Sequence, residues 1–449
     1  MTFLRISIRR WRHRSDVTKF RHTTIIAVVI ANMVGTGVFT SLGFQLLDIR
    51  SGFVLLMLWA VGGVIALCGA MTYAELGAAM PRSGGEYNFL TRIYHPAVGF
   101  ASGWVSATVG FAGPTALAAM TFAAYATSSL GGDANPWVLK AIACSLIIVL
   151  TLVHGSTRRN SGGMQVIFTI LKVGVIVVFC IGALWIADTP QPVRFLFAAE
   201  DVPLLTSGAF AVSLIYVSYA YTGWNAATYL SGELHDPQRT LPWILMAGTL
   251  VVMVLYLALN YVFLRVTPME SMVGQLEVGY IAADAAFGEL GGRFAGLVLS
   301  LLLISTVSAM TVAGPRVLHV IGEDIKQLRF LGETNSDGVP ARAILVQSSL
   351  AMIFILTSSF ESVLVFSGFI LALNSLVTVL GVFVLRLRQP DLPRPYRTFG
   401  YPVTPLIYLG LTAWTLVFVV INKTQESMMG LAVIVAGLVV YALFPKQTD

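Results

Sequence analysis

Residues 30–39 read Ile-Ala-Asn-Met-Val-Gly-Thr-Gly-Val-Phe, and residues 219–225 read Tyr-Ala-Tyr-Thr-Gly-Trp-Asn. Each stretch places glycine near the middle of an apolar segment long enough to cross a bilayer. Backbone that leaves helical geometry at membrane depth is tolerated only where protein buries it or where it lines a cavity. Two glycine-broken spans in corresponding parts of a chain therefore predict a transporter's binding site.

The composition predicts an all-α membrane protein. The 449 residues are 56% hydrophobic and 11% charged, whereas soluble domains carry about 25% charged residues. The three cysteines fall inside apolar segments, so no disulfide framework is expected. Twelve apolar segments are each long enough for a transmembrane helix of about 20 residues; they cover residues 22–49, 53–80, 97–130, 137–155, 162–187, 206–231, 240–266, 280–313, 341–358, 362–386, 403–422 and 427–444.

The basic residues predict how the chain lies in the membrane. Most of the 28 lysines and arginines fall in alternate loops when both termini are placed in the cytoplasm. The positive-inside rule predicts this asymmetry. We therefore expect a multi-pass protein of the inner or plasma membrane, with residues 1–21 as a basic cytoplasmic tail and no cleaved signal peptide. The net charge of +6 is then explained by topology, and no nucleic-acid partner is expected.

The positions of the two breaks predict an inverted repeat. They fall in the first and sixth spans, and an offset of five spans gives the second unit the opposite orientation. This is the pattern of a five-plus-five inverted repeat. We expect a ten-helix transport core over residues 22–389, with repeats at 22–187 and 206–389. Residues 390–449 would add helices eleven and twelve and a short cytoplasmic C-terminus.

The first break has the chemistry of a site for a zwitterion. Gly35 and Gly37 lack Cβ, so the backbone can leave helical dihedrals there. The helix that restarts after them exposes free N–H groups and a positive dipole end, which suit a carboxylate. Unwound carbonyls before the break suit an ammonium group, and an amino acid carries both groups. The alternative is that these glycines only allow close helix packing.

The second break surrounds Gly223 with Tyr219, Tyr221 and Trp224, which suits a site with an apolar wall and a hinge. The alternative is an aromatic packing cluster at a kink. A cationic substrate would need a carboxylate near its side chain, and Thr222 does not offer one. Neutral amino acids are therefore favoured, while a cationic amino acid or another amine stays open.

Lys172 lies about 10 residues into the fifth span, and therefore about 15 Å deep. A charge within the membrane is costly and suggests function by default. A buried amine is also able to release its proton. The alternative is that this lysine reaches the interface by snorkelling. Ser305 and Ser308 are candidates to line the region near Lys172 or to bond to their own helix.

Four motifs resemble those of the amino acid–polyamine–organocation (APC) superfamily. Residues 35–39 resemble the broken first helix of that superfamily. The sequence Pro-Arg-Ser-Gly-Gly-Glu-Tyr at 81–87 resembles its loop after helix two. Residues 219–242 resemble helix six and the next loop in the L-type amino acid transporter branch, and residues 394–402 the start of helix eleven. The resemblance implies the leucine-transporter fold, with twelve transmembrane helices and broken helices 1 and 6.

The resemblance also implies roles for individual residues. Lys172 would hold its ammonium where sodium-coupled relatives carry a sodium ion, with Ser305 and Ser308 nearby. Transport would then be sodium-independent, coupled to protons or to exchange. Tyr219 stands where many relatives have a gating phenylalanine, and Trp224 is the second expected gate. The substrate would be bound by Val34, Gly35, Thr36, Gly37, Tyr219, Ala220, Tyr221, Thr222 and Gly223.

The sequence disfavours other classes of protein. An intramembrane enzyme would need a nucleophile with a base, or a metal cluster, inside the spans. The six histidines lie in tails, loops or span ends, and none has metalloprotease spacing. A channel would show a filter loop or a ring of like charges, and a transporter-like sensor would usually add a soluble domain. We therefore expect no enzyme activity, no cofactor and no metal.

One partner seen in related animal proteins is not expected here. In those relatives, a cysteine in the external loop between helices three and four forms a disulfide with a heavy subunit. The corresponding loop, residues 131–136, contains no cysteine. The expected partners are the amino acid substrate and the lipid bilayer.

Overall fold

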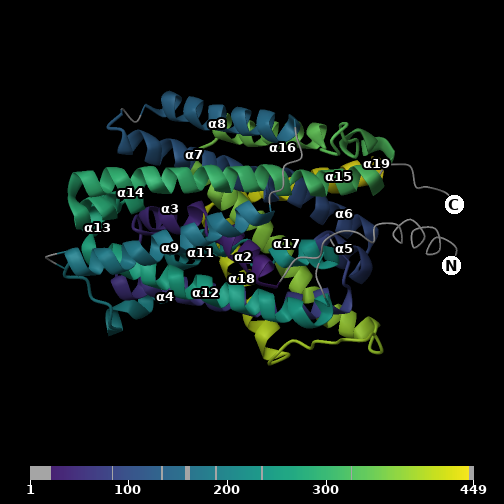
Figure 1. Cartoon of the computed structure of the whole chain (residues 1–449). Helices are drawn as coiled ribbons and strands as arrows, with labels where there is room; N and C mark the ends of the chain where they lie inside the picture. The colour runs from purple at the N-terminus through teal and green to yellow at the C-terminus, as the bar shows by residue number, and fades with distance from the viewer. Residues whose placement is uncertain are drawn as a thin grey trace.

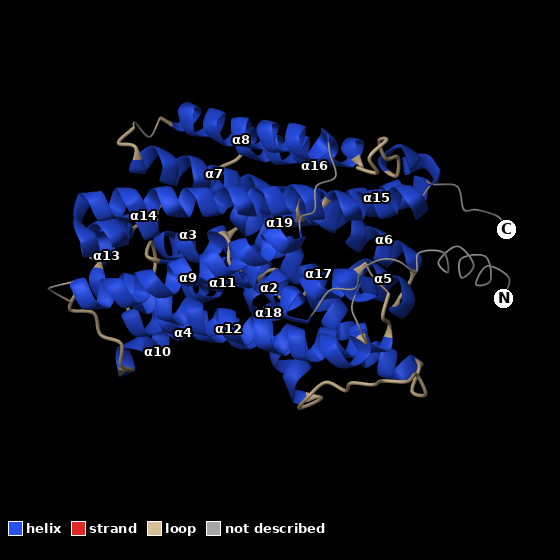
Figure 2. Ribbon diagram, viewed as in Figure 1, coloured by secondary structure: helices blue, strands red, loops and turns tan. Residues whose placement is uncertain are grey.

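The computed structural model describes residues 22–82, 84–132, 135–156, 162–187, 190–233, 236–324 and 326–443. These residues form helices joined by short loops, and none of them is in a strand (Figure 2). The predicted cytoplasmic tail at 1–21 lies outside the described residues.

The helical elements follow one another with few long connections. In chain order they are α2 (His22–Met33), α3 (Thr36–Gln45), α4 (Gly52–Ala79), α5 (Gly85–Ile93), α6 (Pro96–Val105), the π-helix η1 (Ser106–Gly110), α7 (Ala112–Ser129), α8 (Pro136–Ser156), α9 (Gly162–Ile186), η2 (Ala199–Asp201), α10 (Val202–Leu205), α11 (Gly208–Tyr221), η3 (Ala226–Glu233), α12 (Pro237–Val266), α13 (Met269–Met272), α14 (Val278–Ala313), α15 (Pro315–Asp324), η4 (Lys326–Leu331), α16 (Ala341–Thr357), α17 (Phe360–Arg388), α18 (Val403–Asn422) and α19 (Thr424–Leu443).

The long helices run side by side, with α2, α3 and α11 in the middle of the bundle (Figure 1). Helix α14 packs against α7, and α12 packs against α4 and α2. Figure 1 shows α13 near one end of the bundle and α5, α6 and α15 near the other. We call these the α13 end and the α5 end.

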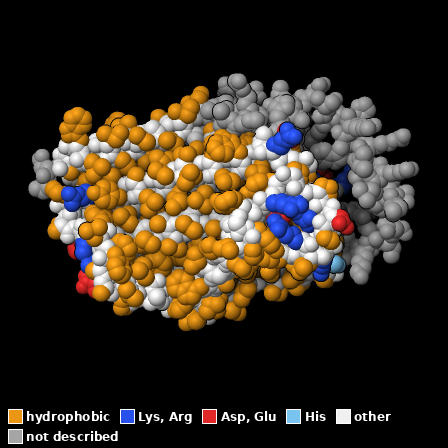
Figure 3. All heavy atoms as spheres, turned by 90° about the horizontal axis from the view of Figure 1, so that it is seen from below, with side chains coloured by type: hydrophobic (Ala, Val, Ile, Leu, Met, Phe, Trp, Pro, Cys, Tyr) orange, Lys and Arg blue, Asp and Glu red, His pale blue; other side chains and the backbone are white. Residues whose placement is uncertain are grey.

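The surface is that of a multi-pass membrane protein. Apolar side chains cover the middle of the face in Figure 3, and charged side chains lie towards its two ends. Ten stretches of the described helical chain are long and apolar enough to cross a membrane, or eleven if residues 199–205 (η2 and α10) form one span with α11, from which they are bent by 67°. The sequence predicts twelve spans. The difference involves α11, which has 14 residues, and α16, which is apolar but has only 17 residues.

Both breaks lie where the glycines predict them. Helix α2 ends at Met33 and α3 begins at Thr36, with non-helical dihedrals of φ −135° and ψ −147° at Gly35. Helix α11 ends at Tyr221, and Gly223 has φ +110°, a value that favours glycine.

The chain after the second break differs from the sequence prediction. A transmembrane helix is predicted to continue to residue 231, but Ala226–Glu233 forms the 3₁₀-helix η3. Its hydrogen bonds reach back three residues, as from the Ala226 N–H to the Gly223 carbonyl at 2.9 Å. The left-handed turn at Gly223 redirects the chain, so the α-helical ladder of α11 does not continue through it.

Candidate functional site

The two breaks pack against each other through their glycines. A Cβ at Gly37 would lie 2.5 Å from the Cα of Ala220, just before the second break. A Cβ at Gly223 would lie 2.8 Å from the carbonyl carbon of Asn32, just before the first break. Each glycine therefore admits the backbone that leads into the other break. This reciprocal contact brings residues that are 183 and 191 positions apart into one site.

Tyr256 of α12 connects the backbones of both breaks. Its hydroxyl lies 2.5 Å from the carbonyl oxygen of Met33 and 3.0 Å from that of Ala220. The side chain is fully buried. Helix ends leave carbonyls without partners inside the helix, and buried ones need a donor from elsewhere. Tyr256 supplies that donor, yet nothing in the long apolar segment around it singles it out by sequence.

Lys172 of α9 reaches the first break. Its Nζ donates to the carbonyl oxygen of Val34 at 3.2 Å and to the hydroxyl of Thr306 at 2.8 Å. The lysine is 5% exposed, so it does not extend to the surface as a snorkelling side chain would. One ammonium group therefore joins α9, the first break and α14.

The two serines singled out by sequence have different surroundings. Ser305 is buried on α14, immediately before the Thr306 that accepts from Lys172. The Ser308 hydroxyl lies 2.8 Å from Nε2 of His154 on α8. The hydroxyl that contacts Lys172 therefore belongs to Thr306 and not to the predicted neighbour Ser305. Sequence spacing does not distinguish two adjacent positions.

Tyr219 spans the gap between the two broken helices. Its hydroxyl lies close to the side chain of Thr36, the first residue of α3. The ring is 6% exposed. Of the two predicted gating residues, Tyr219 has its hydroxyl near the start of α3, whereas Trp224 packs against Tyr73 of α4.

The other aromatic residues of the second break pack away from α3. The Tyr221 hydroxyl donates to the carbonyl oxygen of Trp59 at 3.1 Å, and its ring centroid lies 5.0 Å from that of Tyr256. Trp224 packs edge-on against Tyr73, with centroids 4.6 Å apart. The Thr222 hydroxyl donates to its own helix, to the Ser218 carbonyl at 3.1 Å.

The start of α3 is a buried helix N-terminus without a side-chain cap. Gly35 precedes the helix and provides no side chain to cap it, and every residue of α3 is buried. The first N–H groups of a helix have no partner within it, and the positive dipole end favours negative charge. The buried amides at Thr36 and Gly37 therefore closely follow Val34, whose carbonyl accepts from Lys172.

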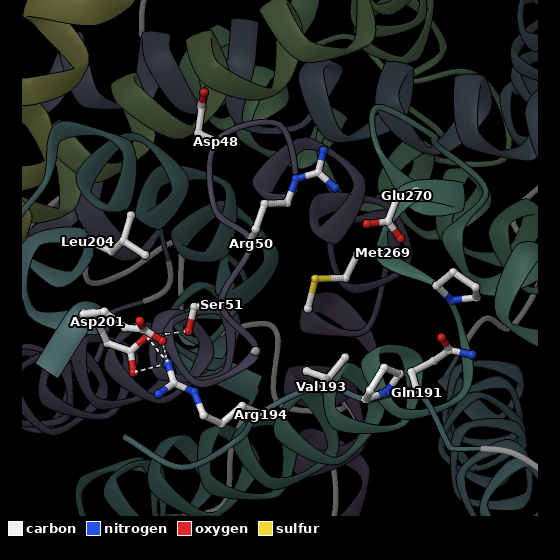
Figure 4. Close-up of a pocket in the computed structure, with 14 residues that line it drawn as sticks. Asp48, Arg50, Ser51, Gln191, Val193, Arg194, Asp201, Leu204, Met269 and Glu270 are labelled. Carbon is white, nitrogen blue, oxygen red and sulfur yellow. Dashed lines mark hydrogen bonds and ion pairs between the residues drawn. The ribbon is translucent and has the colours of Figure 1, made fainter. Parts of the chain in front are cut away.

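A separate surface pocket of about 660 Å³ lies among the loops at the α13 end (Figure 4). Asp201 accepts hydrogen bonds there from the Ser51 hydroxyl at 2.7 Å and from Arg194 at 3.3 Å. Figure 4 shows these three side chains converging, with Arg50 and Glu270 standing apart. The hydrogen bonds to Asp201 therefore join the loops around this pocket, which lies outside the two breaks.

Comparison with known proteins identifies the family of the chain. A family model described as amino acid permease matches residues 20–442. The chain is 26% identical over 429 residues to the serine/threonine exchanger SteT of Bacillus subtilis (strain 168), covering 94% of this chain and 95% of the relative. It is 27% identical to the mouse b(0,+)-type amino acid transporter 1, covering 93% and 86%.

A third relative is the human large neutral amino acids transporter small subunit 2. The identity is 29% over 437 residues, covering 93% of this chain and 78% of the relative. The family match spans the described helices from α2 to α19 apart from the last residue, including both breaks. The chain belongs to the amino acid permease family.

Proposed function

We propose that this chain is a sodium-independent secondary transporter that moves neutral amino acids by alternating access, coupled to protons or to exchange. The observation that carries the proposal is the buried Lys172 ammonium, bonded to Val34 at the first break and to Thr306 of α14. A fixed cation there fills the space between a broken helix and α14. A second positive charge at the same place would be repelled.

In this proposal the substrate's carboxylate binds the free amides of Thr36 and Gly37 at the start of α3. Its ammonium group binds carbonyls of the two breaks, which have second lone pairs beyond those used by Lys172 and Tyr256. The predicted residues Val34, Gly35 and Ala220–Gly223 would complete the backbone of the site. Tyr219 would close over it through its contact with Thr36.

Neutral substrates are proposed because the breaks offer no acidic side chain. Thr222 bonds to its own helix and carries no charge. The names of two relatives also support neutral substrates: one is a serine/threonine exchanger and the other a large neutral amino acids transporter. The exchanger also favours exchange among the possible coupling modes.

The proposal includes twelve spans in a five-plus-five inverted repeat. Helix α16, at 17 residues, would then be a short span, since about 17 residues suffice at the lower limit. The α5 end would face the cytoplasm together with both termini, in the inner or plasma membrane. No disulfide-linked heavy subunit is proposed.

Uptake into proteoliposomes tests this function. Purified protein is supplied with a panel of labelled neutral, cationic and acidic amino acids and simple amines. Each is tested with and without sodium, a pH gradient or internal substrate. We expect uptake of neutral amino acids. This uptake should be independent of sodium and should be stimulated by internal substrate or by a proton gradient. If the protein transports none of these compounds, the proposal is wrong.

A further inference from the structure

A second buried ionisable group lies at the α5 end. Glu86 stands in the first turn of α5 and is 2% exposed. Its carboxyl accepts hydrogen bonds from the Tyr73 hydroxyl of α4 at 2.5 Å and from the Ser375 hydroxyl of α17 at 3.1 Å. The Asn374 amide of α17 donates to its other oxygen. Glu86 therefore links α5 to two long helices.

The same carboxyl also holds the chain that follows the second break. The Asn225 amide donates to Oε1 of Glu86 at 3.1 Å, and the Tyr229 hydroxyl of η3 lies 3.3 Å from Oε2. Asn225 is only two residues beyond Gly223. A movement of this segment away from α4 and α17 must break both hydrogen bonds and admit water to Glu86.

Within the part of the chain that the structure describes, the groups that hydrogen-bond to Glu86 are polar and uncharged. Among the described residues, no lysine, arginine or histidine nitrogen lies within 4.0 Å of its carboxylate. The titratable groups that face it are Tyr73 of α4, Tyr229 of η3 and Tyr408 of α18, the last through Ser375. From α17 it meets neutral groups alone.

Glu75 of α4 shows the contrasting case. It is equally buried at 1% exposed, but Arg386 holds it with two hydrogen bonds of 2.9 and 2.7 Å. A guanidinium pair favours the charged form of a carboxyl. Glu75 thus faces a fixed opposite charge, whereas Glu86 faces neutral dipoles.

Burial raises the pKa of Glu86, and its hydrogen bonds, led by that from Tyr73, offset only part of this effect. Once the carboxyl is hydrated, its pKa returns towards that of an ordinary glutamate. The closed arrangement therefore binds a proton more tightly than the open one. It follows that acid favours the closed arrangement and that opening releases the proton.

We propose that the Glu86 carboxyl is a proton-binding site that senses the pH at the α5 end and governs the opening of that end. The proton enters from water as the segment after Gly223 closes onto α4 and α17, forming the carboxyl O–H bond. It returns to water when the segment moves away. The proposal rests on the alternating access proposed above and adds its regulation by pH.

Infrared spectroscopy tests the binding of the proton without any need for transport. Purified protein is compared between alkaline and mildly acid buffer, and the carbonyl stretch of a protonated carboxyl is recorded. The band is expected to persist above the usual titration range of glutamate and to be lost in Glu86→Gln. A band that is absent, or unchanged in the variant, overturns the proposal even if the protein transports amino acids.

Transport tests the link to opening. Acidifying the compartment at the α5 end is expected to slow transport, by up to about tenfold per pH unit for one proton. Glu86→Gln should remove this dependence, while Glu333→Gln, which alters an exposed acid paired with Arg342, should keep it. A pH dependence that is equal in wild type and Glu86→Gln would overturn the proposal.

A double variant covers the case in which Glu86→Gln does not fold. Glu86→Gln with Asn374→Asp moves the carboxyl to the other side of one hydrogen bond and restores an acid–amide pair. We expect this variant to recover the infrared band and the pH dependence. A folded double variant that shows neither would contradict the inference. If wild type transports no amino acid, the proposed function fails, and the infrared result still decides whether Glu86 binds a proton.

Discussion

The Nζ of Lys172 lies 3.2 Å from the carbonyl oxygen of Val34, so an ammonium group meets the backbone where the first helix breaks. A broken helix in a membrane must satisfy its carbonyls within the protein. Here a charged side chain does so and also fixes α14 through Thr306. The break is therefore tied to the two helices α9 and α14.

Lys172→Gln should lower transport at least about tenfold, because loss of one charge-assisted hydrogen bond costs about 1.5–3 kcal/mol. The pH dependence of transport should change as well if Lys172 exchanges a proton. Initial uptake rates over a range of pH would measure both effects. Lys140→Gln is the control, since Lys140 also donates to a backbone carbonyl, that of Leu356, but lies over Trp137 and away from the breaks. Unchanged uptake in Lys172→Gln would refute the coupling role.

Tyr256→Phe should impair transport while the protein still folds. The change deletes the hydroxyl that serves the carbonyls of Met33 and Ala220, and a buried acceptor left without a donor costs about 1–3 kcal/mol. A fall of about tenfold in kcat/KM is expected. Tyr261→Phe on the same helix is the matched control, since that ring packs on Phe195. Equal activity of the two variants would contradict this role.

Gly37→Ala and Gly35→Ala should differ sharply. A Cβ at Gly37 would lie 2.5 Å from the Cα of Ala220, so two backbones must separate. At Gly35 the nearest atom, on Thr306, would be 3.7 Å away, an ordinary contact. We expect Gly37→Ala to abolish substrate binding in a thermal-shift titration and Gly35→Ala to retain it. The reverse order would contradict the close packing of the two breaks at Gly37.

Glu75→Gln should destabilise the protein strongly. Glu75 pairs with Arg386 at 2.7 Å, and its oxygens also accept from the Thr398 backbone and hydroxyl. Removing one partner of a buried pair costs about 3–5 kcal/mol, although partial exposure of Arg386 reduces this. Thermal unfolding in detergent measures the loss. Glu333→Gln breaks an exposed pair with Arg342 and should cost at most about 1 kcal/mol.

The sequence predicts the breaks well because glycine at mid-span lifts the steric restriction that keeps a helix continuous. It also singles out Lys172, since an isolated charge in an apolar segment stands out. Tyr256 and Thr306 could not be found this way, because tyrosine and threonine are common in membrane helices and their partners lie far away in the chain. The 3₁₀ course of η3 depends on how Gly223 redirects the chain, which residue spacing does not specify.

Tyr256 has one hydrogen to give and two carbonyl oxygens within reach, Met33 and Ala220. When the hydroxyl donates to one carbonyl oxygen, the other oxygen does not receive its hydrogen bond. A ligand ammonium that takes one carbonyl therefore leaves the hydroxyl to the other. Binding of a ligand would then rotate the O–H bond of Tyr256 from the carbonyl of one break to the carbonyl of the other.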